Sequence, residues 1–384
     1  MGDELHNLPQ RLTEVRTLAN QSQSELAGKL GVSASLISHW EKGTRTPSES
    51  QLLDLARHLG VALDYLLNAE IRPSFQCRAR PTSEQRDAIE HTLLEASMQV
   101  HYVDTALRLA KKPPVPFSLW AEFDSFENLP NIAANLRDSL KLNRRVTLDE
   151  LKQALSEWNI YVFDWAMPHH LSGLSFRGPF TAIFINAKHS APRRLFTLAH
   201  EFAHVVFHLG RTDQKTHKRV DTVVSIASIR DPQEKQANAF AGEFLMPRAD
   251  LKALVAKYGD GLRDPAMLEA AAKYFNVSRD AIFYRLTQLD FFKWTDKSAY
   301  FSGSFKLQAP PSVRVENIDA QVDGHFRDIA ISLHQAGDIS TGKLAEWLFT
   351  PRHVVEEYLA DLARQKDLTI TDDCNHEGEP ARAS

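Results

Sequence analysis

The chain has 384 residues, a formal net charge of −4 and an apolar fraction of 43%. Its length suits two or three domains, and its composition is that of a globular protein rather than a disordered one. The slightly acidic balance excludes binding to nucleic acid through overall charge, so any DNA contact must come from a local surface. The sequence has no apolar run long enough to span a bilayer and no secretory signal, so we expect a cytoplasmic protein with no membrane partner. Cys77 and Cys374 predict no disulfide framework.

The first 68 residues have the apolar spacing of a string of short helices. Ser22, with Glu25 three residues later, forms a capping box that starts the second helix. Gly31 makes a tight turn, and a third helix follows from Ser33 and ends at Gly43. Two helices joined by such a turn are typical of a helix-turn-helix, which places its second helix in the major groove of DNA.

Residues near the start of that second helix face base edges, and flanking residues reach phosphates or bases. The candidates for contact with a double-stranded DNA operator are Gln23, Ser33, Ser35, Ser38, His39 and Arg45. Residues 1–67 hold six Lys or Arg against eight Asp or Glu, which is little charge for neutralising phosphates. A small helical bundle that binds protein is therefore the alternative. The detail of the motif, rather than its charge, favours DNA.

The middle of the chain changes from helical to β patterning. Prolines and alternating charges indicate a linker at residues 69–83, and one long helical pattern at 84–112 predicts a spacer or the dimerisation helix of a homodimer. Two more helices are expected between 128 and 155. Residues 159–164 and 181–186 are rich in β-branched and aromatic side chains and predict two strands.

The later part of the chain is predicted to be helical. We expect one helix at about 232–245, a helix-turn-helix-like pair at 267–289 and another at 325–362. Cys374 and a nearby histidine lack a second ligand pair and lie in a charged terminus, so we expect an unstructured tail there rather than a metal site.

The pattern His-Glu-x-x-His occurs within a helical run, at His200, Glu201 and His204. Residues four apart leave the same face of a helix about one turn apart, so the two imidazoles are placed to bind one Zn²⁺ ion. Zinc lowers the pKa of its water and polarises a carbonyl group. Glu201 is the candidate catalytic residue, which accepts a proton from that water and delivers it to a leaving amine.

A catalytic zinc site needs a third protein ligand, and the candidate is Glu234. Glu243 lies nine residues further along the same predicted helix and points to its opposite side. The alternative role for Glu234 is structural. Asp231 suits the N-cap, Pro232 suits the first helical position, and Glu234 would then complete a capping box. The residue pattern alone leaves both roles open.

The strand at 181–186 precedes the motif helix. If it lies at a sheet edge, an extended peptide substrate is expected to pair with it by strand addition.

Residues 8–67 resemble the Cro/C1-type (XRE) helix-turn-helix family. The matching segments are Gln23 to Ala27, Gly31 to Ser33, and Ile37 to Gly43 followed by Pro47. The resemblance implies a five-helix domain that docks its third helix in the major groove.

Residues from about 130 to 247 resemble the ImmA/IrrE family of zinc metallopeptidases. The matching segments are Ile183 to Asn186, Arg194 to His204, and Glu234 to Ala241 with Leu245 to Pro247. In that family the third metal ligand is the glutamate that opens the last motif, here Glu234. The resemblance also implies a zincin-like fold and cleavage of a repressor or antitoxin during stress or mobile-element induction.

We therefore expect a multidomain, mainly α protein with a small mixed α/β zincin-like domain. The expected units are a helix-turn-helix domain at 1–68, the linker and long helix, a peptidase domain at 113–260, an accessory helix-turn-helix at 261–293 and a C-terminal helical region at 294–384. The leading hypothesis is a DNA-binding regulator that cleaves a partner repressor or antitoxin protein. The alternative is a non-catalytic transcription factor or antitoxin whose zincin-like domain is a sensor or interaction module.

Overall fold

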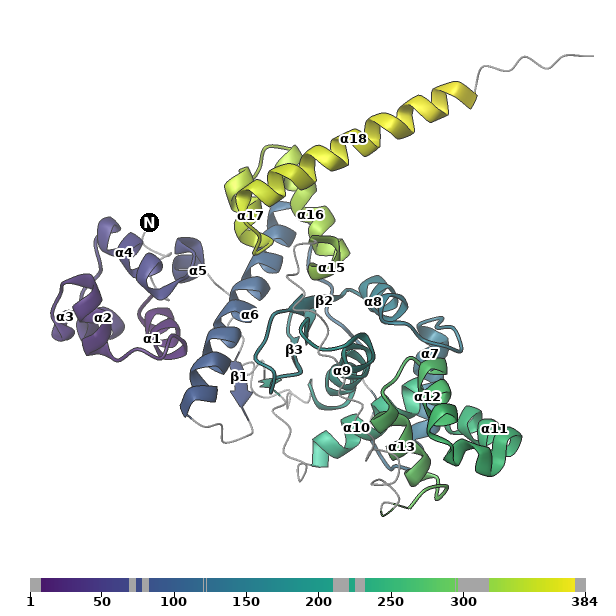
Figure 1. Cartoon of the computed structure of the whole chain (residues 1–384). Helices are drawn as coiled ribbons and strands as arrows, with labels where there is room; N and C mark the ends of the chain where they lie inside the picture. The colour runs from purple at the N-terminus through teal and green to yellow at the C-terminus, as the bar shows by residue number, and fades with distance from the viewer. Residues whose placement is uncertain are drawn as a thin grey trace, which may run out of the picture.

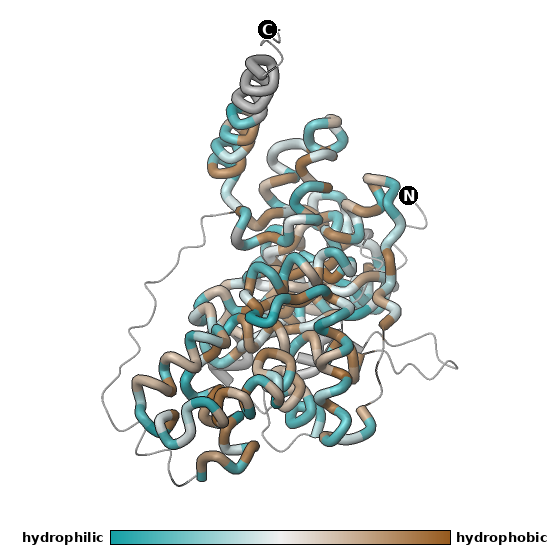
Figure 2. The backbone as a smooth tube through the Cα atoms, turned by 90° about the vertical axis from the view of Figure 1, so that its right-hand side faces the viewer, coloured by the Kyte–Doolittle hydropathy of each residue, from teal (hydrophilic) through white to brown (hydrophobic). Residues whose placement is uncertain are grey.

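The computed structural model describes residues 8–68, 74–77, 83–119, 121, 123–209, 221–224, 232–293, 295 and 318–376. Within them the chain is mainly helical with a small three-stranded mixed sheet, which confirms the expected fold class (Figure 1). Figure 2 shows polar and apolar stretches alternating along the helices, as expected where each helix buries one face. The helices in this part of the chain include none long and apolar enough to cross a membrane.

The N-terminal helices form the expected five-helix bundle. They are α1 (Leu8–Leu18), α2 (Gln23–Leu30), α3 (Ala34–Glu41), α4 (Glu49–Leu59) and α5 (Leu63–Asn68). The predicted capping box is present, because Ser22 accepts a hydrogen bond from the Glu25 amide and Glu25 accepts one from the Ser22 amide. Gly31 follows α2 with a φ of 67°, a left-handed conformation that glycine adopts without strain.

The long helix α6 (Ser83–Leu109) confirms the helical pattern that follows the expected linker. The expected linker itself contains β1 (Ser74–Cys77), which pairs in parallel with β5 (Asp221–Val224). The rest of the expected linker, apart from the first residue of α6, lies outside the described residues.

Three strands form the sheet beside the motif helix: β2 (Ile160–Trp165), β3 (Gly173–Arg177) and β4 (Thr181–Asn186). Their order is β2-β4-β3, with β2 parallel and β3 antiparallel to β4. The expectation of substrate pairing with 181–186 is therefore wrong. This strand is central, and its backbone hydrogen-bonding groups are already used by two neighbours.

Helices precede and follow this sheet in the chain. Before it come α7 (Leu129–Ser139) and α8 (Leu148–Glu157). After it come α9 (Ala191–Ala203), the π-helical turn η1 (His204–His208) and α10 (Pro232–Leu245). Next come α11 (Arg248–Tyr258), η2 (Gly259–Arg263), α12 (Pro265–Tyr274) and α13 (Arg279–Gln288). The C-terminal region contains α15 (Ile318–Gln321), α16 (Gly324–Gln335), α17 (Thr341–Trp347) and α18 (Arg352–His376).

Helix α18 projects away from the body of the molecule (Figure 1). It corrects the expectation of an unstructured tail at Cys374, whose backbone is helical within α18.

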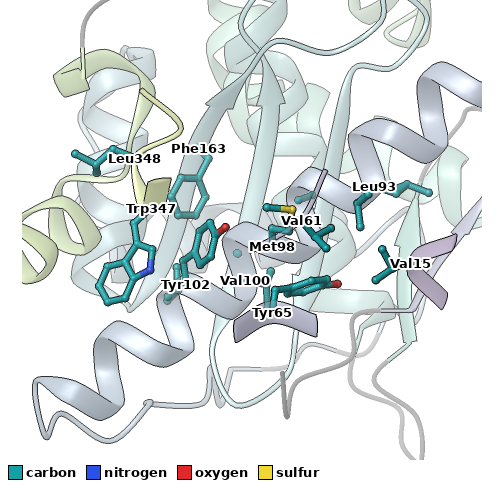
Figure 3. Close-up of a cluster of buried hydrophobic side chains, with 14 of the residues drawn as sticks. Val15, Val61, Tyr65, Leu93, Met98, Val100, Tyr102, Phe163, Trp347 and Leu348 are labelled. Atoms are coloured by element: carbon teal, nitrogen blue, oxygen red, sulfur yellow. The ribbon is translucent and has the colours of Figure 1, made fainter. Parts of the chain in front are cut away.

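Buried apolar residues of the described chain gather in two clusters, one on each face of the sheet. Successive side chains of a strand point to opposite faces, so Tyr161 and Phe163 join one cluster while Ile160 and Val162 join the other. The first cluster also contains the five-helix bundle, α6 and the C-terminal helices. Figure 3 shows its members Tyr65, Tyr102 and Trp347 from three of these regions. The second cluster holds α7 to α13 and contains the motif helix.

Candidate metal centre and nucleic-acid interface

The motif helix α9 is held by apolar residues on the side facing the sheet and α10. Pro192 lies in its first turn, where a proline is compatible with a helix, and Leu195, Leu198 and Phe202 are buried. These contacts fix the rotation of α9, and in this orientation His200 and His204 lie against Glu234, near the start of α10. Helix α9 ends at Ala203, and the chain continues directly into η1, whose first residue is His204.

Helix α10 brings Glu234 against both histidines of the motif. The Glu234 carboxylate oxygens lie 3.2 Å from His200 Nε2 and 3.3 Å from His204 Nε2. The two Nε2 atoms are 3.1 Å apart. Ligand atoms around a tetrahedral zinc ion, roughly 2.0–2.2 Å from it, lie about 3.3 Å from one another. The spacing of these three donors thus fits one zinc-sized ion.

The electrostatics of the three groups favour positive charge between them. Burial alone would raise the pKa of the Glu234 carboxyl, but the two imidazoles outweigh it and hold that pKa well below its usual range. Burial opposes the charged form of His200, yet contact with Glu234 and the nearby Glu201 raises the pKa of its imidazole. A divalent cation would take the same place as this positive charge. Among the described residues, this is the group of histidines and acids with the geometry to hold a metal ion.

Asn238, one turn after Glu234 on α10, contacts His200 on the side of the ring away from Glu234. Its Oδ1 is 3.1 Å from His200 Nδ1, on the opposite side of the ring from Nε2. An acceptor there keeps the ring proton on Nδ1 and leaves Nε2 free to bind a metal.

Glu201 lies beside the donors, beneath strand β3. Its side chain is buried, and the Ser175 hydroxyl donates a hydrogen bond of 2.9 Å to it. Burial raises the pKa of the Glu201 carboxyl. Gly173 passes so close that a Cβ at this position would lie 2.8 Å from Glu201 Cγ and Oε1. The strand therefore needs a residue without a side chain at this point.

Sequence reasoning missed Gly173 and Ser175 because it did not predict β3. The signal was present: Leu174 and Phe176 alternate with small or polar residues over five positions, the period of a half-buried strand.

A cavity of about 460 Å³ opens beside Glu234. Phe126 and Leu129 form an apolar wall, and Asn238 lines the side toward His200. Phe126 is 52% exposed, and its ring packs edge-on against Phe123 with the ring centres 5.0 Å apart. Glu243 lines the same cavity and does not contact the histidines, because it is paired with the buried Arg285.

Five of the six DNA-contact candidates lie on α3 or close beside it in the chain, and the sixth, Gln23, is the first residue of α2. Ser35, His39 and Arg45 are exposed, and Ser38 is half-buried. Gln23 Nε2 donates to Glu41, so its amide is already engaged.

Ser33 is the N-cap of α3 and accepts a hydrogen bond from the Leu36 amide. This structural role is separate from the base contact expected for it. His39 Nδ1 lies 2.8 Å from the Thr44 hydroxyl, which orients its ring.

The fold and the two sites define a protein class. A five-helix helix-turn-helix bundle is joined through α6 to a mixed α/β domain with the donor set of a His-Glu-x-x-His metallopeptidase. Comparison with known proteins gives the same result. Residues 12–66 match the helix-turn-helix family model, and residues 158–287 match the model of the IrrE N-terminal-like domain. The chain therefore contains an XRE-type helix-turn-helix domain and a domain of the IrrE/ImmA peptidase family, which confirms both resemblances.

Two curated proteins are similar to parts of the chain. The HTH-type transcriptional regulator ImmR of Bacillus subtilis is 28% identical over 147 residues, which are 38% of this chain and 98% of ImmR. An uncharacterized HTH-type transcriptional regulator of Haemophilus influenzae is 33% identical over 75 residues, or 20% of this chain. The chain spans only 31% of that second relative. No solved structure matches the chain significantly.

Proposed function

We propose that the chain is a cytoplasmic transcriptional regulator that binds a DNA operator and whose second domain is a zinc endopeptidase. Its substrate is a partner repressor or antitoxin protein. The observation that carries the enzymatic part is the convergence of His200, His204 and Glu234 from two helices on one ion-sized space. The family match of residues 158–287 supports the same conclusion.

In this proposal the three donors hold one Zn²⁺ ion, which when bound polarises the scissile carbonyl and lowers the pKa of a water. Glu201 accepts the proton of the attacking water and passes it to the leaving amine. Its burial suits this role, because a carboxyl with a raised pKa is a better match to a proton transferred near neutral pH. Ser175 and Gly173 hold the carboxyl in place, and the cavity lined by Phe126 receives a substrate side chain next to the donors.

The Glu201→Gln variant tests the proposed activity. Glutamine keeps the size of the side chain and its contact with Ser175 but accepts no proton, so cleavage should fall by about 10²–10⁴-fold while bound zinc is unchanged. The measurement is electrophoresis of proteins encoded beside this chain after incubation with wild type or variant, together with zinc content. Wild-type protein that holds zinc but cleaves none of these proteins would favour the non-catalytic alternative, in which the domain is a sensor.

The Gly173→Ala variant tests the position of Glu201. A methyl group 2.8 Å from Glu201 and from Thr197 Cγ2 forces the carboxyl to move. Since a displacement of about 1 Å at a reacting group costs on the order of 10²-fold in rate, cleavage should drop by that amount with zinc retained. Gly242→Ala is the matched control, because its new Cβ would make an ordinary contact of 3.5 Å with Arg285. Equal cleavage by both variants would contradict this placement of Glu201.

For the DNA-binding domain, Ser38→Ala is expected to change sequence preference by about 1–3 kcal/mol at one base position, because a side chain in the groove reads one base edge. The measurement is selection from a randomised double-stranded DNA library by the full chain. Thr17→Ala on the exposed face of α1 serves as the control. Binding that depends on salt but not on sequence in wild type would remove the operator from this proposal.

A further inference from the structure

A third histidine, His208, lies behind the second histidine of the motif. His208 Nδ1 is 2.9 Å from His204 Nδ1, on the side of the ring away from Glu234. On its other side, His208 Nε2 is 2.9 Å from Gln236 Oε1. The three side chains form one row from the donor set to helix α10. His208 is outside the donor set, because its nearest nitrogen faces Nδ1 of His204 and not Nε2.

The order of donors and acceptors along this row follows from the chemistry of the first ring. If Nε2 of His204 binds a metal, its lone pair is used there and the ring proton is on Nδ1. That N–H donates to His208 Nδ1, which must then be the unprotonated nitrogen. The proton of His208 is consequently on Nε2, where it donates to the amide oxygen of Gln236. Each contact in the row is thus satisfied by one arrangement of protons.

The π-helical turn is the local structure that makes the row possible. The Leu209 amide donates to the His204 carbonyl, a bond across five residues that widens the turn. Arg177 of β3 donates to the carbonyls of Val205 and Leu209 and so holds the widened turn in place. The ring centres of His204 and His208 are 4.9 Å apart as a result. A π-helical turn within a helix is often found at a functional site.

We propose that His208, held by Gln236, is a positioning residue that fixes the tautomer and the orientation of His204 for metal binding. The proposal rests on the zinc site of the proposed function and deepens it. Outer contacts of this kind raise the basicity of a ligand and keep its ring aligned. The two ligand histidines are thereby supported differently. Asn238 contacts His200 directly, whereas Gln236 acts on His204 through a second imidazole.

The experiment measures zinc affinity of the full-length, metal-stripped chain by competition with a chromogenic chelator. The His208→Leu variant should bind zinc about 10–100-fold more weakly than wild type, as expected for loss of an outer partner of a ligand. The His208→Asn variant should recover most of this loss, since its side-chain oxygen replaces the Nδ1 acceptor. Unfolding of the metal-free variants serves to separate this effect from general stability, and His91→Leu, at an exposed position of α6, is the matched control.

A second pair of variants tests the far end of the row without changing a histidine. Gln236→Glu keeps an acceptor for His208 and should retain zinc affinity, whereas Gln236→Leu should lose affinity in the same direction as His208→Leu. The absorption spectrum of the Co²⁺-substituted protein should shift in the Leu variants, because the ligand field changes when the His204 ring turns.

The outcomes separate this inference from the proposed function. A wild-type chain that binds no zinc would overturn the proposed function. Wild-type binding with unchanged affinity in His208→Leu, or no recovery in His208→Asn, would overturn the role of His208 alone.

Discussion

The Glu234→Gln variant is expected to lose its zinc while helix α10 remains intact. Glutamine completes a capping box as well as glutamate does, but it offers no anionic ligand to a metal. Its zinc affinity should therefore fall by more than the roughly 10–100-fold that loss of an outer hydrogen-bond partner costs. This variant distinguishes the two roles that the sequence leaves open for Glu234.

Thermal unfolding with and without zinc provides the measurement. Zinc at a hundred times its dissociation constant stabilises the wild-type fold by about 2.7 kcal/mol, and this gain should be absent in Glu234→Gln. The exposed neighbour Lys235, changed to glutamine, is the control on the same turn of α10. A Glu234→Gln chain that keeps both zinc and its stabilisation would show that the carboxylate is a cap only. The predicted cap partner Asp231 lies outside the described residues.

The Arg285→Met variant is expected to destabilise the peptidase-family domain by about 3–5 kcal/mol, because it leaves a buried carboxylate without its partner. Arg285 on α13 and Glu243 on α10 form an ion pair whose side chains are 6% and 4% exposed. Burial lowers the pKa of the Arg285 guanidinium to about 10. The pair joins α10, which carries Glu234, to the helices predicted as an accessory unit.

Chemical denaturation of the full chain measures this loss. The double variant Glu243→Leu with Arg285→Met should be more stable than Arg285→Met alone, since no charge is then buried unpaired. Arg279 provides a matched control on the same helix. Its pair with Glu269 is 23% and 42% exposed, so Arg279→Met should cost no more than about 1 kcal/mol. If Arg279→Met and Arg285→Met lowered the free energy of unfolding equally, the buried pair would not stabilise the packing of α13 on α10.

The secondary structure was largely predictable where a local rule determines it. The capping box at Ser22, the glycine after α2 and the limits of α10 are each specified by residues within one or two turns. Strand β3 was missed because its five residues alternate too briefly beside stronger patterns. The strand β1 within the expected linker depends on a partner more than 140 residues away in the sequence, which no local pattern indicates.

The domain limits drawn from the sequence stay a prediction, but the packing bears on them. Helices α12 and α13 share one buried cluster with α9 and α10, and the family match extends to residue 287. The first cluster similarly unites the five-helix bundle, α6 and the C-terminal helices. Asp64 of α5, for example, accepts hydrogen bonds from His101 of α6 and Lys343 of α17.

The sequence by itself determined which side chains are the candidates for metal binding, because two histidines four residues apart share a helix face whatever surrounds them. Only the tertiary structure decided which other residues lie around the two histidines and complete the candidate metal site. It set Glu234 across from both rings, a glycine over Glu201, and a row of contacts behind His204. It also made the strand at 181–186 central rather than an edge. These features come from packing between segments distant in the sequence, where the positions of whole helices and strands, and not the preference of any residue, fix the distances.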